Sequence, residues 1–442
     1  MARITLSADR RCFIRDDKPF FLMADTCWSA FTNPTMEEWE EYLLLRREQG
    51  FNAVMINVLP QWDRSLAPGE KANPFGNGDH QLWHFSRIPS SYFDHDCLML
   101  DKLRALDMIP VLVLLWSNYT NGTFFDHLWG HSPMDPACVP EYADYVARRF
   151  RAYEPVYFVS GDTNFSNQAA EKYYLPALHA LKAADPQALA SLHICGDGFT
   201  SVREVEDSIP AALLYSPEID FRAFQSGHFG GYADRCRDCA KAFAQLQNTL
   251  PVLNAEPCYE GWDSPGDNTH GAAEMRRTTW LSLLSGACAG LAYGAQGVWQ
   301  WYREGDFFAP DKNNRLGERP LYTCLTPFPA WDALNFPGAL DRTFARKLVE
   351  KHALWALTPS DEVCAPTPAT CMAHTADQHA FAAYIPRNQT TGFSFPEEGW
   401  QLTLYHLAER REIPCQILPG EGGFTLPPYG LNSDLLLIGE RK

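Results

Sequence analysis

Two acidic residues stand directly after short apolar segments with the character of β-strands. Asp162 follows Val156–Ser160 and a single glycine, and Glu256 follows Val252–Ala255. Cleavage of a glycosidic bond needs two carboxyl groups in opposite states. One is protonated and gives its proton to the leaving oxygen, and the other is ionised and meets the oxocarbenium-like carbon. Asp162 and Glu256 are therefore our candidates for a catalytic pair.

The surrounding sequence predicts the scaffold that would hold these acids. Short apolar runs alternate with helical patterns over about 340 residues, which is typical of βαβ units and of a (β/α)₈ barrel with enlarged loops. The predicted helices are Met36–Gln49, Asp94–Leu106, Pro140–Phe150 and Tyr232–Thr249. The predicted strands are Phe20–Ala24, Asn52–Leu59, Pro110–Trp116, Val156–Ser160, Leu189–Cys195, a sixth at either Ala212–Ser216 or Ile219–Gln225, Val252–Ala255 and Gly290–Tyr293.

A doubly wound open sheet is the alternative to the barrel. We disfavour it because no glycine-rich phosphate-binding turn follows an early strand. In a barrel the active site lies at the C-terminal tips of the strands, and strands four and seven face each other. The tips that carry Asp162 and Glu256 can therefore flank one bond.

The other predicted tips are rich in polar and aromatic residues, which suits a ligand with many hydroxyl groups. The expected substrate-binding residues at the tips are Asp25, Asn57, Trp116, His193, Gln225, His228, Tyr293 and Gln296. Asp25 has a structural acceptor as its alternative role. His228 is expected to donate to a substrate hydroxyl or to orient Glu256, and its alternative role is that of a core histidine satisfied by the backbone. Trp299, like Trp62, Trp83 and Trp116, is a candidate platform for a sugar ring or else part of the core.

From about residue 355 the helical period disappears and proline-rich connectors separate short alternating segments. These are Thr370–His374, His379–Ile385, Gln401–His406, Cys415–Leu418 and Leu435–Ile438. They predict an antiparallel β-sandwich. We expect a catalytic barrel over residues 1–350 and a small β-domain over residues 351–442.

Composition excludes some classes of binding partner and indicates the cellular compartment. The net charge of −17 disfavours nucleic acid and anionic membranes. The charged N-terminus lacks the apolar core of a signal peptide, and no apolar run is long enough for a membrane span. Thirteen cysteines without a repeating frame fit free thiols in a reducing compartment. We expect a cytoplasmic protein, and the sequence does not fix its oligomeric state.

Two spacings could suggest a metal, but we expect none, and no cofactor. His127 and His131, beside Asp126, lie next to the helix breakers Gly130 and Pro133 without a third ligand at a matching interval. Cys236 and Cys239 form a lone CxxC. Glu260 lies four residues after Glu256, beyond a proline, so we expect it to support the site and not to act as the nucleophile.

Six segments in this order resemble the apiosidase-like enzymes of glycoside hydrolase family 140. They are Met23–Trp28, Glu48–Asn52, Val159–Asn164, Gln225–His228, Asn254–Glu260 and Tyr293–Trp301. The resemblance covers residues 10 to 440, including a terminal domain often labelled collagen-binding in such proteins. The chain departs from many relatives at Ser160 and Ala255, where they carry glycine.

The resemblance implies a (β/α)₈ glycoside hydrolase with Asp162 and Glu256 as its catalytic pair, and we assign Asp162 as acid/base and Glu256 as nucleophile. It also brings Trp28, Asn164 and Tyr259 into the expected substrate-binding set. We expect a retaining, exo-acting enzyme for a small glycoside, with apiose or another pentofuranose as the terminal sugar. The alternatives are a carbohydrate-binding barrel without catalysis and a matrix-adhesion role of the terminal domain.

Overall fold

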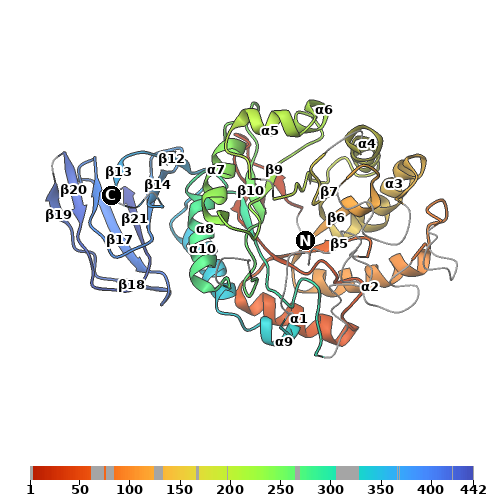
Figure 1. Cartoon of the computed structure of the whole chain (residues 1–442), viewed down its shortest axis with the longest axis horizontal. Helices are drawn as coiled ribbons and strands as arrows, with labels where there is room; N and C mark the ends of the chain where they lie inside the picture. Colours follow the sequence, from red (N-terminus) through yellow and green to blue (C-terminus); the bar gives the residue numbers. More distant parts are fainter. Residues whose placement is uncertain are drawn as a thin grey trace.

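The structure is a computed structural model. It describes residues 3–60, 74–75, 84–123, 133–165, 169–196, 198–263, 269–304, 328–365, 367, 369–420 and 422–441. Figure 1 shows a barrel surrounded by helices, with a β-domain attached at one side beyond α7, α8 and α10. None of the described helices is long and apolar enough to cross a membrane.

The barrel sheet has eight parallel strands in the order β8-β7-β6-β5-β4-β11-β10-β9. Their bounds are β4 (Leu22–Thr26), β5 (Ala53–Asn57), β6 (Ile109–Trp116), β7 (Val156–Gly161), β8 (Ala190–Ser191), β9 (Arg222–Gln225), β10 (Val252–Glu256) and β11 (Gly290–Tyr293). The predicted (β/α)₈ fold is confirmed. The sixth strand is the later alternative, because Ala211–Leu214 forms the helix α6 instead.

The ring closes between β8 and β9 without a strand ladder. Asp220 bridges the gap with its backbone N–H, which donates to the Ala190 carbonyl at 2.9 Å, and with its carboxylate, which accepts from the Ala190 N–H at 2.8 Å. The Ser191 hydroxyl donates to the Phe221 carbonyl at 2.6 Å. At this junction one backbone hydrogen bond of Asp220 and the side chains of Asp220 and Ser191 connect the two strands in place of a strand ladder.

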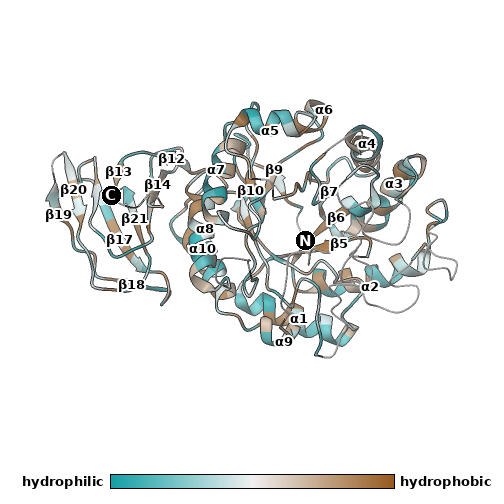
Figure 2. Cartoon of the chain, in the orientation of Figure 1, coloured by the Kyte–Doolittle hydropathy of each residue, from teal (hydrophilic) through white to brown (hydrophobic). Residues whose placement is uncertain are grey.

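Helices cover the outer side of the barrel, with their polar faces toward solvent (Figure 2). They are α1 (Met36–Gln49), α2 (Ser90–Ala105), α3 (Val139–Phe150), α4 (Leu175–Ala184), α5 (Val202–Ser208), α6, α7 (Tyr232–Ala244), α8 (Ala272–Leu283), α9 (Ala330–Ala333) and α10 (Gly338–Lys351). Short 3-10 turns occupy Ser117–Tyr119, Pro136–Cys138 and Arg151–Tyr153, and a π-turn occupies Ala170–Tyr174.

Helix α1 has the bounds that the sequence predicts because both of its ends are marked. At its start, the Thr35 hydroxyl accepts from the Glu38 N–H, and the Glu38 carboxylate accepts from the Thr35 N–H. At its end, Gly50 adopts φ 103°, a left-handed conformation that suits glycine.

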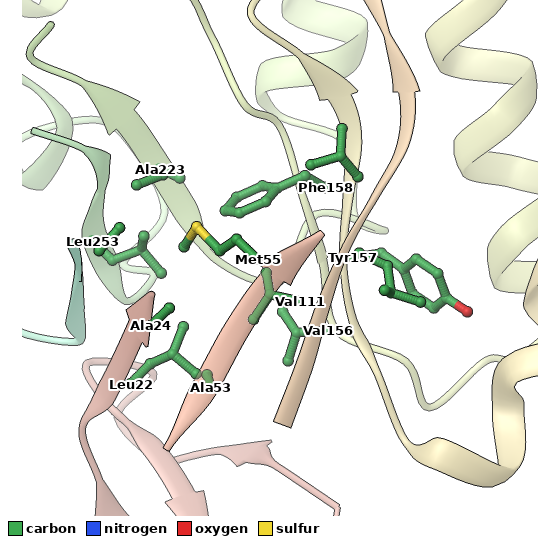
Figure 3. Close-up of a cluster of buried hydrophobic side chains, with 14 of the residues drawn as sticks. Leu22, Ala24, Ala53, Met55, Val111, Val156, Tyr157, Phe158, Ala223 and Leu253 are labelled. Carbon is green, nitrogen blue, oxygen red and sulfur yellow. The ribbon is translucent and has the colours of Figure 1, made fainter. Parts of the chain in front are cut away.

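Alternation along the strands separates the barrel interior from the helix layer. Leu22, Ala24, Ala53 and Met55 converge inside the barrel, whereas Tyr157 points away from it (Figure 3). Paired residues of parallel neighbours share a face, so the register carries this assignment around the ring.

A three-stranded antiparallel sheet at the N-terminus was not predicted. It consists of β1 (Thr5–Leu6), β2 (Phe13–Arg15) and β3 (Lys18–Phe20). Phe13 is buried with its ring centroid 5.4 Å from that of Phe221, which in turn packs on Phe158 of the barrel interior. This sheet therefore packs onto the barrel core.

The C-terminal unit contains two antiparallel sheets, as predicted. One has the order β12 (Thr358–Ser360), β14 (Cys371–His374), β15 (Ala380–Ile385), β21 (Leu435–Arg441), β17 (Trp400–His406) and β18 (Arg411–Ile413). The other has the order β13 (Val363–Cys364), β16 (Thr391–Phe393), β20 (Gly423–Leu426) and β19 (Leu418–Gly420). The strand predicted at Cys415–Leu418 is displaced in the structure, where β19 begins only at Leu418 and continues to Gly420.

The six-stranded sheet uses both of its faces. Phe381, Leu404 and Leu437 fill the space between the two sheets. Tyr384 and Ile438, on the opposite face, belong to the same hydrophobic cluster as the barrel. The β-domain is therefore packed on the barrel through an apolar surface.

Candidate active site

Five polar side chains lie on the inner side of the barrel at the C-terminal tips of their strands. The register places Asn57 on the inner face with Met55, and Ser160 with Phe158. His193 lies two residues beyond Ser191, the inward partner of Phe158, and Gln225 lies two residues beyond the inward Ala223. The fifth is Glu256, which pairs with Gln225. The structure thus gathers four predicted site residues, together with Ser160, at one end of the barrel.

Glu256 reaches the interior through an irregularity in β10. Asn254 pairs with Phe224, and Glu256 pairs with Gln225, so Ala255 is an extra residue between two consecutive partners. In a regular strand Ala255 would take the inward position and Glu256 would face the helices. The bulge corrects the direction of Glu256, a function that bulges often serve beside active sites.

The Glu256 carboxylate lies between two histidines. Nε2 of His228 is 3.1 Å from Oε1, and Nε2 of His193 is 3.2 Å from Oε2, off the line of a well-aligned hydrogen bond. Burial alone would raise the pKa of Glu256, but the interactions with His193 and His228 outweigh it and lower this pKa well below its usual range. Glu256 is therefore ionised at neutral pH.

His193 is held rigidly by its neighbours on β7. The Ser160 hydroxyl accepts from the His193 N–H at 3.1 Å and lies 3.0 Å from the His193 carbonyl. The backbone N–H of Asp162 donates to Nδ1 of the ring at 3.1 Å. The rings of Trp28, Trp116 and Phe158 surround the imidazole, which is fully buried. Nothing in this packing leaves the ring free to rotate.

His228 is held in a similar way from the other side. Its Nδ1 accepts the backbone N–H of Tyr259 at 3.3 Å. Its ring stacks on Trp262 with a centroid distance of 4.5 Å, and its carbonyl lies 2.7 Å from Nε2 of His270. The ring of His228 therefore faces the carboxylate of Glu256 with Nε2 while the backbone satisfies its Nδ1.

Asp162 turns the chain away from β7. Its φ of 45° is left-handed, a conformation that aspartate tolerates better than most residues. Gly161 precedes it because a Cβ there would lie 2.3 Å from the ring of Trp116. The turn aims the Asp162 N–H at His193, and the Asp162 residue itself is only partly buried.

Aromatic side chains surround the acids. Trp28 donates its Nε1–H to the hydroxyl of Tyr259 at 2.8 Å. Burial and the charge of Glu256 raise the pKa of Tyr259 well above its usual value, so this phenol stays protonated beside the carboxylate. Trp299 donates to Oε1 of Gln296 at 2.9 Å, and its ring centroid is 6.4 Å from that of Trp262. These contacts connect the predicted Trp28, Tyr259, Gln296 and Trp299 in one wall.

Some buried polar atoms near this wall have no hydrogen-bond partner in the described part of the chain. They include Nε1 of Trp116, Oε1 of Gln225 and Nε1 of Trp262. Each of these residues is more than nine-tenths buried. Unpaired buried polar atoms are costly, so these three atoms are available to a polar group beside the wall.

Two predicted substrate ligands lie instead in the helix layer. Asp25 is fully buried, and its Oδ2 accepts from Nε of Arg46 and from the Tyr42 hydroxyl, each at 2.7 Å. Tyr293, its register partner, donates to Oε2 of Glu260 at 2.7 Å. Alternation turns both residues outward, so Asp25 takes its alternative role as a structural acceptor, and Tyr293 is also structural.

Glu260 supports the scaffold, as expected. Its Oε1 accepts the Gly338 N–H at the start of α10 at 3.1 Å, and burial raises its pKa. Asn164 lies two residues beyond Asp162 and is partly buried. Trp62, Trp83, Asp126, His127 and His131 lie outside the described residues. In the ranges that the structure describes, no three His, Cys, Asp or Glu side chains gather as a metal site.

Sequence reasoning missed two residues of the site. Ser160 holds the backbone of His193, and its inward position next to Phe158 was a usable signal. Trp262 stacks on His228, and a tryptophan three residues after the predicted ligand Tyr259 could have drawn attention. The contact of His228 with Glu256 matches one of the two roles expected for it, whereas the contact of His193 with Glu256 had no signal beyond the place of His193 at a strand tip.

Comparison with known proteins shows the family to which the chain belongs. A family model described as the apiosidase-like catalytic domain matches residues 7–356. One similar solved structure is a glycoside hydrolase with 17% identity and a TM-score of 0.75, over 100% of this chain and 97% of the other. Another is a glycoside hydrolase family 5 protein from Bacteroides vulgatus with 18% identity and a TM-score of 0.75, over 99% and 93%. No curated protein matches the chain.

Proposed function

Because this chain belongs to the family of apiosidase-like catalytic domains and is a glycoside hydrolase, we propose that it removes a terminal sugar from a small glycoside with retention of configuration. The observation that supports the proposal is an ionised Glu256 at the end of β10, held between His193 and His228, while the partly buried Asp162 directly follows β7. These are the seventh and fourth strands of the barrel.

In this proposal Glu256 is the nucleophile. Its low pKa keeps the Glu256 carboxylate ionised at neutral pH, and the bulge at Ala255 turns this side chain toward the inside of the barrel. Asp162 is the acid/base. It gives its proton to the leaving oxygen as Glu256 forms a bond to the anomeric carbon, and it then takes a proton from the water that breaks this bond.

The sugar would occupy the space bounded by the aromatic wall. Nε1 of Trp116 offers a donor and Oε1 of Gln225 an acceptor for ring hydroxyls, and Asn57 adds an amide at the neighbouring tip. Trp28, Tyr259, Trp262 and Trp299 supply apolar surface. Apiose or another pentofuranose is the proposed sugar, a choice that rests on the family and its name.

Substitution of either acid tests the roles. Asp162→Asn and Glu256→Gln should each lower kcat by about 10³-fold or more, since each removes a group that acts directly on the bond. Glu260→Gln is the matched control, because Glu260 is a buried glutamate in the helix layer. Hydrolysis of a panel of aryl glycosides, with circular dichroism to verify folding, measures the effect.

Azide rescue separates the roles and tests retention. In Glu256→Gly, azide should restore turnover and give a glycosyl azide of inverted configuration. In Asp162→Gly, the azide product should keep the configuration of the substrate. Wild-type product of inverted configuration, observed by NMR at early times, would contradict the retaining mechanism.

We also propose that the enzyme works in the cytoplasm and belongs to glycoside hydrolase family 140. Support for the location comes from the twelve described cysteines, which are all thiols, most of them buried. Fractionation of the native cell with an antibody to the protein tests the location, and recovery in the culture medium would contradict it.

A further inference from the structure

The ring of His193 connects the two acidic residues of the proposed mechanism. On one side it accepts the backbone N–H of Asp162 at 3.1 Å, and on the other its Nε2 lies 3.2 Å from Oε2 of Glu256. A single imidazole thus spans from the tip of β7 to the tip of β10.

The backbone contacts fix the protons on both histidines. Because Nδ1 of His193 accepts an N–H, its lone pair is there and the ring proton is on Nε2, facing Glu256. The same reasoning applies to His228, whose Nδ1 accepts the Tyr259 N–H. Both rings therefore place Nε2–H toward one carboxylate.

The two histidines differ in what they connect. The donor to His228 is Tyr259, three residues after Glu256, so His228 ties Glu256 to its own loop. The donor to His193 is Asp162 on a different strand. Ser160 and three aromatic rings immobilise His193, so a shift of Glu256 or of Asp162 is opposed by the same ring.

We propose that His193 is a positioning residue that sets the place of the proton donor Asp162 relative to the nucleophile Glu256, whereas His228 positions Glu256 alone. This inference rests on the proposed function. Proton transfer to a leaving oxygen fails when the donor is displaced, and displacement of about 1 Å can cost about 100-fold in rate. Among the described residues, Glu256 brings its titratable side chain to the His193 ring, and Asp162 contacts the ring through its backbone N–H. His228 and Tyr259 interact with the Glu256 carboxylate.

Leaving groups of different basicity test this division. A basic leaving group needs the proton of Asp162, and an activated phenol does not. His193→Phe keeps a ring but removes both contacts, so we expect a loss of about 100-fold on poor leaving groups and of only about 10-fold on activated ones. His228→Phe should lose the same factor on both classes.

His193→Asn sharpens the comparison, because its side-chain oxygen lies near the place of Nδ1 and can still accept the Asp162 N–H. It should behave like His228→Phe, with little dependence on the leaving group. In all three variants the acid limb of kcat/KM should move to higher pH, since each removes an interaction that lowers the pKa of Glu256. A purely structural role of His193 would not move that limb.

Equal losses of His193→Phe on all leaving groups would overturn the proposal. A second measurement needs no variant: ¹⁵N-histidine NMR of the wild-type protein should show two buried Nε2–H tautomers, and a proton on Nδ1 of His193 would also overturn it. If wild type hydrolyses no glycoside of the panel, the proposed function fails, while the NMR result still decides the tautomer.

Discussion

Glu256 and Asp25 are both buried acids near strand ends, yet their surroundings give them opposite properties. Asp25 lies in the helix layer, where burial raises its pKa despite the neighbouring Arg46. Glu256 lies in the barrel interior, where two imidazole N–H groups lower its pKa. The direction of the side chain from its strand, and not its burial, therefore separates Asp25 from the proposed nucleophile Glu256.

Glu256 and Glu260 should show opposite pH effects on stability. A lowered pKa contributes stability above the unfolded pKa of about 4.3, and this contribution is lost as pH falls through the folded pKa. A raised pKa, as for Glu260, contributes below about 4.3 and is lost as pH rises.

Urea unfolding of Glu256→Gln and Glu260→Gln between pH 3 and pH 7 measures both effects. The deficit of Glu256→Gln relative to wild type should shrink by about 1–3 kcal/mol toward low pH. The stability deficit of Glu260→Gln relative to wild type should shrink toward neutral pH. Parallel curves for the two variants would show that their folded pKa values do not differ in this way.

At the residue scale, the sequence placed Asp162 and Glu256 at strand tips but did not predict the direction of every side chain. Alternation from the inward Ala24 and Ala292 shows that Asp25 and Tyr293 point outward, so both could have been excluded once the strand bounds were known. The same rule would have excluded Glu256, because the bulge at Ala255 depends on pairing with β9 and has no mark in β10 alone.

The connection after β7 shows how a short segment builds a site. Ser160 holds the backbone of His193, Gly161 leaves space for Trp116, and Asp162 turns left-handed and supplies an N–H. Three consecutive residues thus each make a different contact that fixes the position of His193 or Trp116.

Gly161→Ala should disturb this connection. The new Cβ would lie 2.3 Å from the Trp116 ring, which cannot yield easily because it packs against Trp28 and His193. We expect a loss of about 1–3 kcal/mol in stability and a fall in kcat. Gly392→Ala is the control, since its Cβ would meet atoms at ordinary contact distance, 3.7 Å. Thermal unfolding and kinetics of both variants decide; equal effects would contradict the packing argument.

Elements with marked ends were the ones that sequence predicted best. Helix α1 is bounded by a capping box and a glycine, and β11 by turns, and both match their predicted bounds. The predicted strand Leu189–Cys195 shrinks to Ala190–Ser191, because the chain beyond it leaves the ladder to place His193. Contacts between distant segments of this kind cannot be predicted from the local sequence alone.

At the scale of the whole molecule, buried charges link the barrel to the β-domain. Arg276 of α8 contacts Asp341 of α10 at 2.9 Å and Asp434 of the β-domain at 2.8 Å. Arg410 of the β-domain contacts Asp341 at 2.6 Å. His352 and Tyr405 add a further bond across the interface at 2.8 Å. The two units are thus joined by both apolar packing and charge.

Asp434→Ala should destabilise the whole protein, because it leaves Arg276 with one partner fewer in a mostly buried place. A loss of about 3 kcal/mol is expected from removal of one member of a buried ion pair. Asp361→Ala, at an exposed site of the same domain, serves as control. A single cooperative transition at lower Tm is expected in calorimetry. An early separate transition of the β-domain alone would contradict joint unfolding.

The sequence predicted that a β-domain follows the barrel but not how it attaches. Its alternating segments show one apolar face, which fills the sandwich. The second buried face is made of small and mixed residues such as Ala382 and Tyr384, which do not stand out as a docking surface in the sequence.

The junction between β8 and β9 has a consequence for how such enzymes diversify. A ring held there by a serine and an aspartate can lengthen or shorten at this seam without breaking a strand ladder. His193 and Gln225 follow the two strands of the seam, whereas Glu256 is anchored one strand away. Substitutions at Ser191 or Asp220 should therefore change the spacing of His193 and Gln225 and leave the proposed nucleophile, Glu256, where it is.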